Sequence, residues 1–289
     1  MVADGSALSA LARAKINLTL HLCGQRSDGY HLLDSLVVFP EIGDFLTAEP
    51  ATGLSLSLDG PFGQTLSAAG DNLVLKAAEQ LSNGNAKGAA LHLQKNLPVA
   101  SGIGGGSSNA ATALALLSRM WDVQVPNSLA LSLGADVPVC QQAPKAHRMQ
   151  GIGDNLTLVP NMPDFWIVLV NPMVSVQTSA VFTGTPDKSP PSGPEMPSAG
   201  FHDFATLCSW LAQGRNDLEP AAAKLCPEIP NVLAALADAP LARMSGSGAT
   251  CFAIYADQDT AAAKSDALRG ATDWWIASGP VHAGLKQAH

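Results

Sequence analysis

The sequence predicts an α+β protein built in two layers. Residues 11–22 alternate between apolar and polar side chains as a strand does, and Ser107–Trp121 carries the apolar stripe of a helix. The helices and strands further along the chain follow no strict β–α–β order, which favours α+β over α/β. Prolines interrupt the pattern between residues 159 and 164. We therefore expect two domains, residues 1–160 and residues 161–289.

The N-terminal half contains the clearest alternation. From Ala12 to Leu22 every second side chain is apolar, and the polar ones between them run from Arg13 to His21. This pattern predicts one strand with one face on a core and one polar face. Further strands are expected at Leu54–Leu58 and Leu91–Gln94, and helices at 71–81 (with Asp71 or Asn72 as N-cap), Ser107–Trp121 and 128–134.

The C-terminal half starts with a buried strand at Phe165. Gly184–Gly200 holds five prolines and little that could form a core, so it is either a surface loop or a disordered segment. The other elements expected here are helices near 202–213, 217–226, 230–238 and 259–269, and strands at Thr250–Tyr255 and Trp274–Ala277.

The composition excludes some functional classes. The chain has 289 residues, of which 47% are apolar and 14% are charged, and its mean hydropathy is +0.15. A chain of this length can bury a core without disulfides or metals. Its formal net charge of −8 argues against a general nucleic-acid binder, because such a protein needs a basic surface to displace counterions. A local basic spot for a small anionic ligand remains compatible with this charge.

Cysteine spacing and hydropathy bear on localisation. No two of the five cysteines have C-x-x-C spacing, so reduced thiols are expected rather than a zinc site. Asp4 precedes any apolar stretch and no basic region precedes it, so no secretory signal is expected. The longest apolar run, Phe165–Val170, is far shorter than the roughly 20 residues of a membrane span. We expect a cytoplasmic protein that binds neither membranes nor nucleic acid.

The most informative segment is the glycine-rich stretch Pro98–Ser108, between a strand and a helix. Its four glycines allow positive φ and leave backbone N–H groups uncovered, and the following helix adds its positive N-terminal end. Together these features predict a phosphate site, to which Ser107 and Ser108 can add hydroxyls for the phosphate or for a magnesium ion. The spacing fits neither the Walker loop nor the dinucleotide fingerprint. A strand-to-helix turn without a ligand is the less favoured alternative.

Two smaller motifs leave alternatives open. Ser27–His31 combines an Asp-Gly turn signal with an aromatic ring and an imidazole, which suits a hairpin turn with packing as well as a site. Met244–Ala249 is a cluster of small residues before a strand. Such a cluster occurs where two backbones, or a backbone and a ligand, come close, and a plain tight turn explains it equally well.

Three segments in this order resemble a known family: Ala14–Leu18, Pro98–Ala111 and Ser245–Ala249. The chain resembles the GHMP family of small-molecule kinases. Asp28–His31 and Gly134–Pro138 are similar to the branch that phosphorylates a cytidine-diphosphate-linked methylerythritol, in the non-mevalonate route to isoprenoid precursors. The resemblance implies an N-terminal domain like that of ribosomal protein S5, a C-terminal ferredoxin-like domain, and ATP-dependent phosphorylation of the substrate's 2-hydroxyl.

The resemblance also implies roles for individual residues. The catalytic lysine and aspartate fall on Lys15 and Asp136, and Asn72 and Lys95 match positions near the nucleotide. Without the family, Lys15 would be a lysine on a solvated strand face, and Asp136 an N-cap or turn residue. The ATP-binding residues implied are Pro98, Val99, Ala100, Ser101, Gly102, Ile103, Gly104, Gly105, Gly106, Ser107 and Ser108, and the substrate-binding residues are Asn17, Tyr30, His31, Thr178 and Phe182.

Tyr30 and Phe182 are expected to sandwich the cytosine ring while His31 reads its polar edge. Triphosphate chemistry implies Mg²⁺, but no acidic ligand stands out by its spacing. A monomer or a weak homodimer is expected. The chain departs from the family pattern at Ala100–Ser101, at Gln150, where an acidic residue is common, and in residues 184–200, which have no alignable counterpart.

Two competing functions remain open. The first is another kinase of the same family, acting on mevalonate, homoserine or a sugar, since the glycine-rich loop suits all of them. Only Asp28–His31 and Gly134–Asp136 separate these kinases. The second is a catalytically silent nucleotide-binding protein with the same fold, against which the presence of both Lys15 and Asp136 counts.

Overall fold

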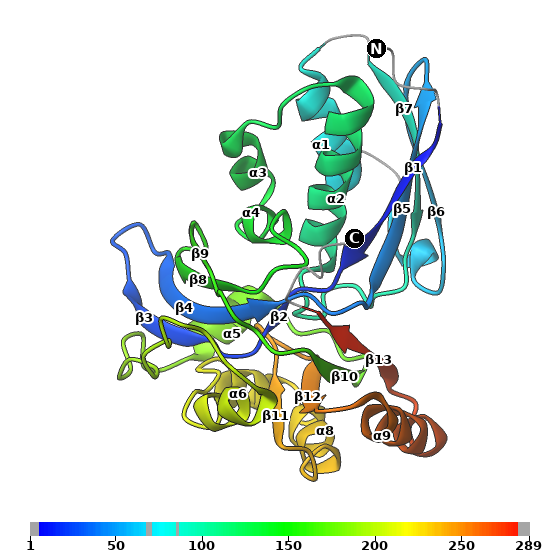
Figure 1. The fold of residues 1–289 in the computed structure, drawn as a ribbon. Coiled ribbons are helices and arrows are strands. Elements are labelled where there is room, and N and C mark those ends of the chain that lie inside the picture. Colours follow the sequence, from blue (N-terminus) through cyan, green and yellow to red (C-terminus); the bar gives the residue numbers. More distant parts are fainter. Residues whose placement is uncertain (1–5, 68–70, 85–86, 283–289) are drawn as a thin grey trace. The chain divides into compact units, whose positions relative to one another are not determined.

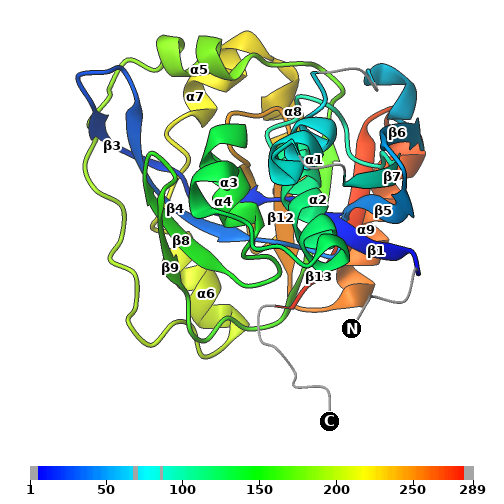
Figure 2. The same ribbon diagram turned by 90° about the horizontal axis from the view of Figure 1, so that it is seen from above.

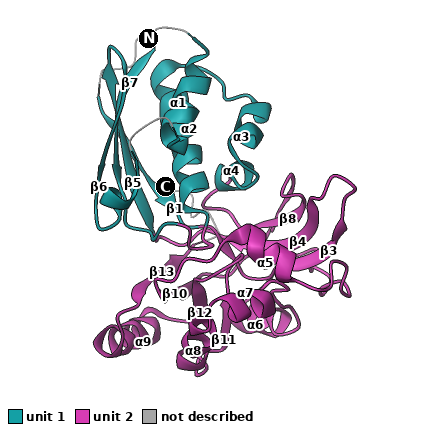
Figure 3. Ribbon diagram, turned by 180° about the vertical axis from the view of Figure 1, so that it is seen from behind, with its two compact units in different colours: residues 1–14, 43–99, 104–141 teal, residues 15–42, 100–103, 142–289 magenta. Residues whose placement is uncertain are grey.

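The computed structural model describes residues 6–67, 71–84 and 87–282 (Figure 1). Asp4, on which the expectation about a secretory signal depends, lies outside these residues. The chain forms two compact units, each built from segments that are distant in sequence (Figure 3). The division at residue 160 stays a prediction. The first unit comprises residues 1–14, 43–99 and 104–141, and the second comprises residues 15–42, 100–103 and 142–289.

The first unit is a four-stranded sheet packed against helices. The strand order is β1-β5-β7-β6, antiparallel except for the parallel pair β6–β7. Helix α2 packs on β1 and β5, and α1 packs on β6, which makes two layers. The strands are β1 (Leu8–Arg13), β5 (Gly43–Ala51), β6 (Leu54–Asp59) and β7 (Gly88–Gln94), and the helices are α1 (Leu73–Ser82), α2 (Gly105–Trp121), α3 (Asn127–Leu133) and α4 (Val137–Cys140), with a short 3-10 turn at Gly63–Thr65.

The helices of this unit follow the local sequence signals. Asn72 caps α1, since its Oδ1 accepts the N–H of Val74 at 2.9 Å, so the predicted start of this helix is confirmed. Helix α2 begins at Gly105, slightly before the predicted start, because Gly104 adopts φ +64° at the N-cap. The alanine-rich face of α2 is buried against the sheet, as the apolar stripe predicted.

The second unit contains two sheets. One is antiparallel with the order β11-β12-β10-β13, and helices α8 and α9 pack on it. The other has the order β2-β4-β8-β9, with β3 also paired to β4. The strands are β2 (Ile16–Asn17), β3 (His21–Gln25), β4 (His31–Val38), β8 (His147–Gly151), β9 (Asn155–Leu158), β10 (Phe165–Asn171), β11 (Leu241–Met244), β12 (Cys251–Tyr255) and β13 (Trp275–Val281), and the helices are α5 (Thr178–Gly184), α6 (Phe204–Leu211), α7 (Glu219–Leu225), α8 (Glu228–Ala235) and α9 (Gln258–Ala271).

The single strand predicted over residues 11–22 is wrong. Its first part is β1, paired with β5 in the first unit, and its later part forms β2 and β3, both paired with β4 in the second unit. The polar face is not solvated either, because every side chain from Ala14 to Leu22 is buried. Most buried polar groups on this stretch have hydrogen-bond partners, as those of Thr19 and His21 do, and such partners allow polar residues to alternate with apolar ones in a buried segment.

The predicted strand at Phe165 and all four predicted helices after residue 200 are confirmed within a few residues. Five strands and two helices of the described residues had no prediction: β4, β5, β8, β9, β11, α4 and α5. None of the helices in the described part of the chain has the length and hydropathy of a membrane span. The overall α+β class is confirmed.

Residues 185–200 form the surface loop, not the disordered alternative. The segment has no helix or strand and passes β3 on its way from α5 to α6 (Figure 2). Side chains from elsewhere in the second unit hold its backbone: Trp210 Nε1 donates to Glu195 O at 2.9 Å, and Asn161 Nδ2 donates to Ala199 O at 2.8 Å. These hydrogen bonds hold the loop in place, although its own sequence cannot form an apolar core.

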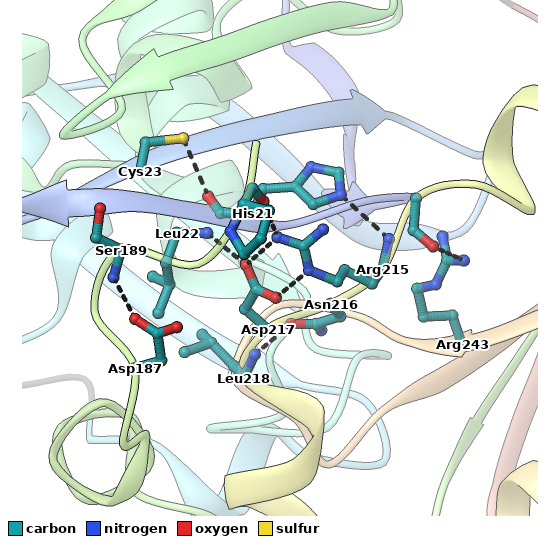
Figure 4. Close-up of polar contacts among 12 residues, drawn as sticks. His21, Leu22, Cys23, Asp187, Ser189, Arg215, Asn216, Asp217, Leu218 and Arg243 are labelled. Carbon is teal, nitrogen blue, oxygen red and sulfur yellow. Dashed lines mark hydrogen bonds and ion pairs between the residues drawn. The ribbon is translucent and has the colours of Figure 1, made fainter. Parts of the chain in front are cut away.

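A partly buried polar network holds this loop (Figure 4). The Arg215 guanidinium pairs with Asp217, with a distance of 2.5 Å between Nε and Oδ1, and it also donates to Pro191 O. Asp217 Oδ2 accepts the N–H of Leu22 at 2.7 Å, and His21 Nε2 accepts the N–H of Arg215 at 3.2 Å. Burial, and then the charge of Arg215, lower the pKa of His21, so this histidine serves as a neutral acceptor.

Candidate active site

The glycine-rich loop ends in an open helix N-terminus. Three of its residues take positive φ, namely Ala100 (+52°), Gly102 (+75°) and Gly104 (+64°). The first bond inside α2 runs from Ser108 N to Gly104 O at 2.8 Å. The N–H groups of residues 105–107 therefore have no carbonyl partner within the helix, and they point out of its positive end. This is the geometry of a phosphate site.

A buried ion pair lies directly under the first turn of α2. Lys95 Nζ is 2.7 Å from Asp44 Oδ2 and donates to Leu97 O at 2.8 Å. Asp44 Oδ1 in turn accepts the backbone N–H groups of Asn96 and Leu97. A Cβ added at Gly105 would lie only 3.3 Å from the Lys95 ammonium, so the glycine lets the helix start close to the pair.

Burial lowers the pKa of Lys95, and the charge of Asp44 opposes that shift. The Lys95 ammonium thus supports the turn on which α2 begins, while its charge is largely balanced by Asp44. Its expected proximity to the nucleotide stays a prediction.

The two serines of the loop differ in what their hydroxyls do. Ser108 is buried, and its Oγ donates to Arg13 O at 2.5 Å and contacts Cys140 Sγ at 3.3 Å. Ser107 is half-buried, and no hydrogen bond of its hydroxyl is recorded among the described residues. Ser107 is therefore the hydroxyl that can turn toward a ligand, whereas Ser108 fixes the helix to its unit.

Asp136 lies beside this helix end in the same unit. It occupies the N-cap position of α4, but its side chain makes no capping hydrogen bond, so the capping explanation is not supported. Helix α4 packs on α2, and a Cβ added at Gly134 would lie 3.9 Å from Ser107 Oγ. The turn that carries Asp136 thus adjoins the hydroxyl at the start of α2.

In the second unit, parts of the three motifs that carried the resemblance meet. Lys15 is buried, and its backbone N–H donates to Ile103 O at 2.9 Å, one residue before Gly104. The N–H of Asn17 donates to Ser245 Oγ at 3.1 Å. Lys15 is thereby held against the glycine-rich loop at the point where the chain turns into α2.

The small residues of Met244–Ala249 are explained by a close approach of two backbones. A Cβ at Gly102 would lie 2.5 Å from Gly248 O, and a Cβ at Gly246 would lie 2.6 Å from Gly102 O. Thr250 also holds this stretch, since its N–H and its hydroxyl both donate to Ser101 O, at 3.2 and 2.6 Å. The meeting of two backbones is therefore confirmed, and so is the tight turn, since the N–H of Gly248 donates to Ser245 O at 3.1 Å.

The side-chain amide of Asn17 is held by one hydrogen bond, and one of its two polar atoms has no partner in the described part of the chain. Its Nδ2 donates to Ser35 Oγ at 2.7 Å, and Ser35 Oγ donates on to Thr19 O at 2.5 Å. Its Oδ1 is buried and has no partner among the described residues. Because a buried polar atom without a partner is unfavourable for folding, this carbonyl oxygen is a candidate ligand contact.

His31 and Phe182 form a stacked ring pair in the second unit. The ring centroids are 4.7 Å apart and the planes differ by 19°. Tyr30, by contrast, is 59% exposed. Thr178, at the start of α5, shares a 2.8 Å hydrogen bond with Ser247. The ring stacked on Phe182 is therefore His31, and the expected sandwich of cytosine between Tyr30 and Phe182 stays a prediction.

One ring nitrogen of His31 is buried without a hydrogen-bond partner in the described ranges. Its Nδ1 has no partner among the described residues. Burial, and then the nearby Lys188 ammonium, lower the pKa of His31, so the ring is neutral near neutral pH. A neutral imidazole can accept or donate a hydrogen bond, as its tautomer allows.

Sequence reasoning missed three residues that hold this site: Asp44, Ser35 and Ser245. The signal available for Asp44 was a carboxylate, one of two with Glu41, within the otherwise apolar stretch between Phe39 and Leu46. Ser245 belongs to one of the segments that carry the resemblance, but the sequence assigned no role to its hydroxyl. Ser35 carried no signal, because a serine in a strand is ordinary.

Family models match both halves of the chain. The model described as GHMP kinases N terminal domain matches residues 72–154, and the one described as GHMP kinases C terminal matches residues 198–272. A solved structure of 4-(cytidine 5'-diphospho)-2C-methyl-D-erythritol kinase is 30% identical, with a TM-score of 0.79 over 96% of this chain and all of that one. The mevalonate kinase of L. major, 13% identical with a TM-score of 0.64, shares the fold.

Curated relatives are more similar still. The chain is 53% identical to 4-diphosphocytidyl-2-C-methyl-D-erythritol kinase of Cereibacter sphaeroides (strain ATCC 17029 / ATH 2.4.9), over 93% of this chain and 97% of that one. It is 52% identical to the kinase of the same name from Ruegeria pomeroyi, over 95% of this chain and 99% of that one. The chain therefore belongs to the GHMP kinases and, within them, to the 4-diphosphocytidyl-2-C-methyl-D-erythritol kinase family.

Proposed function

We propose that this protein transfers the γ-phosphoryl group of ATP to the 2-hydroxyl of 4-diphosphocytidyl-2-C-methyl-D-erythritol, in the non-mevalonate route to isoprenoid precursors. Identity near 50% to kinases of that name over almost the whole chain supports the proposal. The observation that carries it is the meeting of Lys15 with the glycine-rich loop at Ile103, directly before the open N-terminus of α2.

ATP is the phosphoryl donor, and its phosphates bind the loop Pro98–Ser108. The N–H groups of residues 105–107 and the positive end of α2 supply the attraction, since the chain as a whole is acidic. The Lys95–Asp44 pair lies under this turn and supports it. Backbone donors that are already in position need no reorganisation during the reaction.

Phosphoryl transfer to an alcohol needs an acceptor for the hydroxyl proton. Asp136 takes that role, since its carboxylate does not cap α4 and its turn adjoins the start of α2. A positioned base of this kind contributes about 10²–10⁴ in rate. Lys15 favours the charged form of the attacking oxygen, and its positive charge stabilises the negative charge that develops on the transferring group.

Magnesium accompanies ATP in this chemistry. In the described part of the chain no three His, Cys, Asp or Glu side chains come together as a metal site. Mg²⁺ is commonly held by substrate phosphates and water together with one or two protein oxygens. Ser107 is the protein oxygen that fits, since its half-buried hydroxyl lies at the start of α2. When bound, the ion neutralises charge on the phosphates.

The acceptor substrate binds in the second unit through side chains. Asn17 Oδ1 accepts a hydrogen bond from the substrate, and His31 reads the edge of the cytosine. Tyr30, Phe182 and Thr178 complete the pocket. An exposed Tyr30 has room to move onto a bound base, and stacking on aromatic rings is worth about 1–3 kcal/mol per base.

A panel of acceptors tests the function directly. The purified protein with ATP and Mg²⁺ is offered the cytidine-diphosphate-linked methylerythritol, mevalonate, homoserine and galactose, and ADP release is followed. Turnover of the first compound alone is the expected result. Turnover of another alcohol in its place would favour a different GHMP kinase, and ATP binding without any turnover would favour a silent nucleotide-binding protein.

The base assignment is tested by Asp136→Asn. We expect kcat to fall by about 10²-fold or more while the affinity for ATP changes by less than about twofold, because the amide keeps the shape but cannot take the proton. Asp259→Asn, an exposed position on α9, is the matched control. If the Asp136 variant keeps more than roughly a tenth of kcat, Asp136 is not the base.

A further inference from the structure

Lys188 is a cation placed next to the ring pair of His31 and Phe182. It lies in the proline-rich loop, four residues after the end of α5. Its Nζ donates to Phe182 O, so the ammonium is held at the residue whose ring stacks on His31. Its side chain is half-buried, which leaves part of it open to a ligand.

Unlike the other cations on the surrounding elements, Lys188 pairs with no carboxylate in the described part of the chain. Arg26, Arg148 and Arg215 each pair with a carboxylate, at 2.7, 2.5 and 2.5 Å respectively. Within the described ranges of the chain, no carboxylate lies within ion-pair distance of Lys188. Its one recorded partner is a neutral carbonyl, which leaves the positive charge unbalanced.

An unbalanced, half-buried ammonium is suited to an anion. The chain carries a net charge of −8, so an anionic ligand needs a local cation to approach. Lysine binds phosphates as a point charge, through donors that can rotate toward several oxygens. The field of Lys188 does reach His31, since it contributes to the lowered pKa of that ring.

We propose that Lys188 binds the diphosphate of the cytidine-linked substrate and so contributes to the selection of a nucleoside diphosphate beside the ring pair. This inference rests on the proposed function. It gives a role to part of the loop 184–200, which has no alignable counterpart in the family pattern. Within this reading the hydrogen bond to Phe182 O aims the ammonium, and the remaining two N–H donors face the ligand.

The variant Lys188→Gln tests the charge while keeping an N–H donor for Phe182 O. We expect KM for the cytidine-diphosphate-linked substrate to rise about 10- to 100-fold, as for loss of a charged hydrogen bond, with kcat and KM for ATP changed by less than about twofold. Lys188→Arg, which keeps the charge, should stay within about fivefold of the wild type. Lys264→Met on α9 is the control lysine of the same unit.

Three further measurements separate charge from a structural role. CDP and cytidine are compared as competitive inhibitors: Lys188→Gln should weaken CDP and leave cytidine unchanged. Added salt should raise the KM of the wild type for the cytidine-linked substrate. It should raise the KM of the variant much less, because salt screens the charge of Lys188, which the variant lacks. The pKa of His31, followed by NMR, should rise toward its ordinary value of 6.5 in the variant.

The outcomes are distinguishable from failure of the proposed function. If the wild type phosphorylates the cytidine-linked substrate and Lys188→Gln keeps its KM, the proposal about Lys188 is wrong and the function stands. If CDP and cytidine weaken equally and salt has the same effect on both proteins, Lys188 only supports α5. If the wild type does not phosphorylate this substrate, the proposed function fails first.

Discussion

The start of α2 and the region of the ring pair differ in whether their buried polar groups have hydrogen-bond partners. Under α2, Lys95 and Asp44 are buried and satisfied by each other and by the backbone. In the second unit, by contrast, Asn17 Oδ1 and His31 Nδ1, the latter on the ring pair, are buried without partners among the described residues. The first region thus offers backbone N–H groups on a rigid base, and the second offers side-chain atoms that a substrate must satisfy.

The difference follows from what each ligand demands. A triphosphate group is the same in every ATP molecule, so backbone N–H groups at a helix N-terminus can bind it without specific side-chain contacts. A particular alcohol linked to a particular base needs atoms that reject the wrong partner, and unpaired buried groups provide that rejection. Buried polar atoms without hydrogen-bond partners lower the free energy of unfolding, and such atoms are common at functional sites.

The largest effect should come from breaking the satisfied pair. Lys95→Met leaves the Asp44 carboxylate buried without its cation, so we expect the free energy of unfolding to fall by about 3–5 kcal/mol. Both side chains are almost fully buried, with 3% and 0% exposed, which justifies the full value. Urea unfolding at neutral pH measures it.

The double variant Asp44→Asn/Lys95→Met is the control for this pair. It removes both charges and keeps an acceptor for the N–H groups of Asn96 and Leu97. We expect it to be more stable than Lys95→Met, because no charge is left buried alone. A Lys95→Met protein within about 1 kcal/mol of the wild type would show that the pair does not hold the turn.

An intermediate effect is expected at the two adjacent serines. Ser108→Ala loses the hydrogen bond to Arg13 O and should lower the free energy of unfolding by about 1 kcal/mol, with little change in kinetics. Ser107→Ala should leave stability within about 0.5 kcal/mol and raise KM for ATP. Thermal unfolding and ATP titration of both variants measure this contrast. The reverse pattern would mean that Ser108, not Ser107, faces the nucleotide.

The smallest effect on stability should come from His31→Phe. The ring stack with Phe182 is kept and the unpartnered Nδ1 is removed, so stability at neutral pH should stay equal or rise by up to about 1 kcal/mol. Discrimination between cytidine and uridine diphosphate ligands should be lost at the same time. Retained discrimination would remove His31 from the reading of the base.

The same variant has a defined pH dependence. Because the folded pKa of His31 lies below 6.5, the unfolded chain binds its proton first, and the wild type loses stability as pH falls below that value. His31→Phe should lose less stability on acidification. His21 and His147 share the direction of shift, so the pH dependence is reduced rather than abolished. An unchanged acid dependence would show that His31 is protonated equally in both states.

The local sequence was sufficient for much of the helical part and for the chemistry of the loop. Asn72 before an apolar stripe, and Gly104 before the alanine-rich helix, are signals contained within a few residues. The candidate residues Lys15 and Asp136 came from the resemblance, since neither spacing nor periodicity distinguishes a catalytic lysine from a solvated one. Their roles in the reaction remain proposals.

What the sequence determined by itself is therefore the identity of many local elements and the presence of a glycine-rich helix start. Only the tertiary structure decided that residues 11–22 divide between two sheets, that Lys95 is neutralised by Asp44, and that His31 stacks on Phe182. The physical reason is that helix caps and positive φ depend on neighbouring residues. Burial and charge pairing depend on side chains brought together from positions far apart in the chain, here 51 residues apart for Lys95 and Asp44.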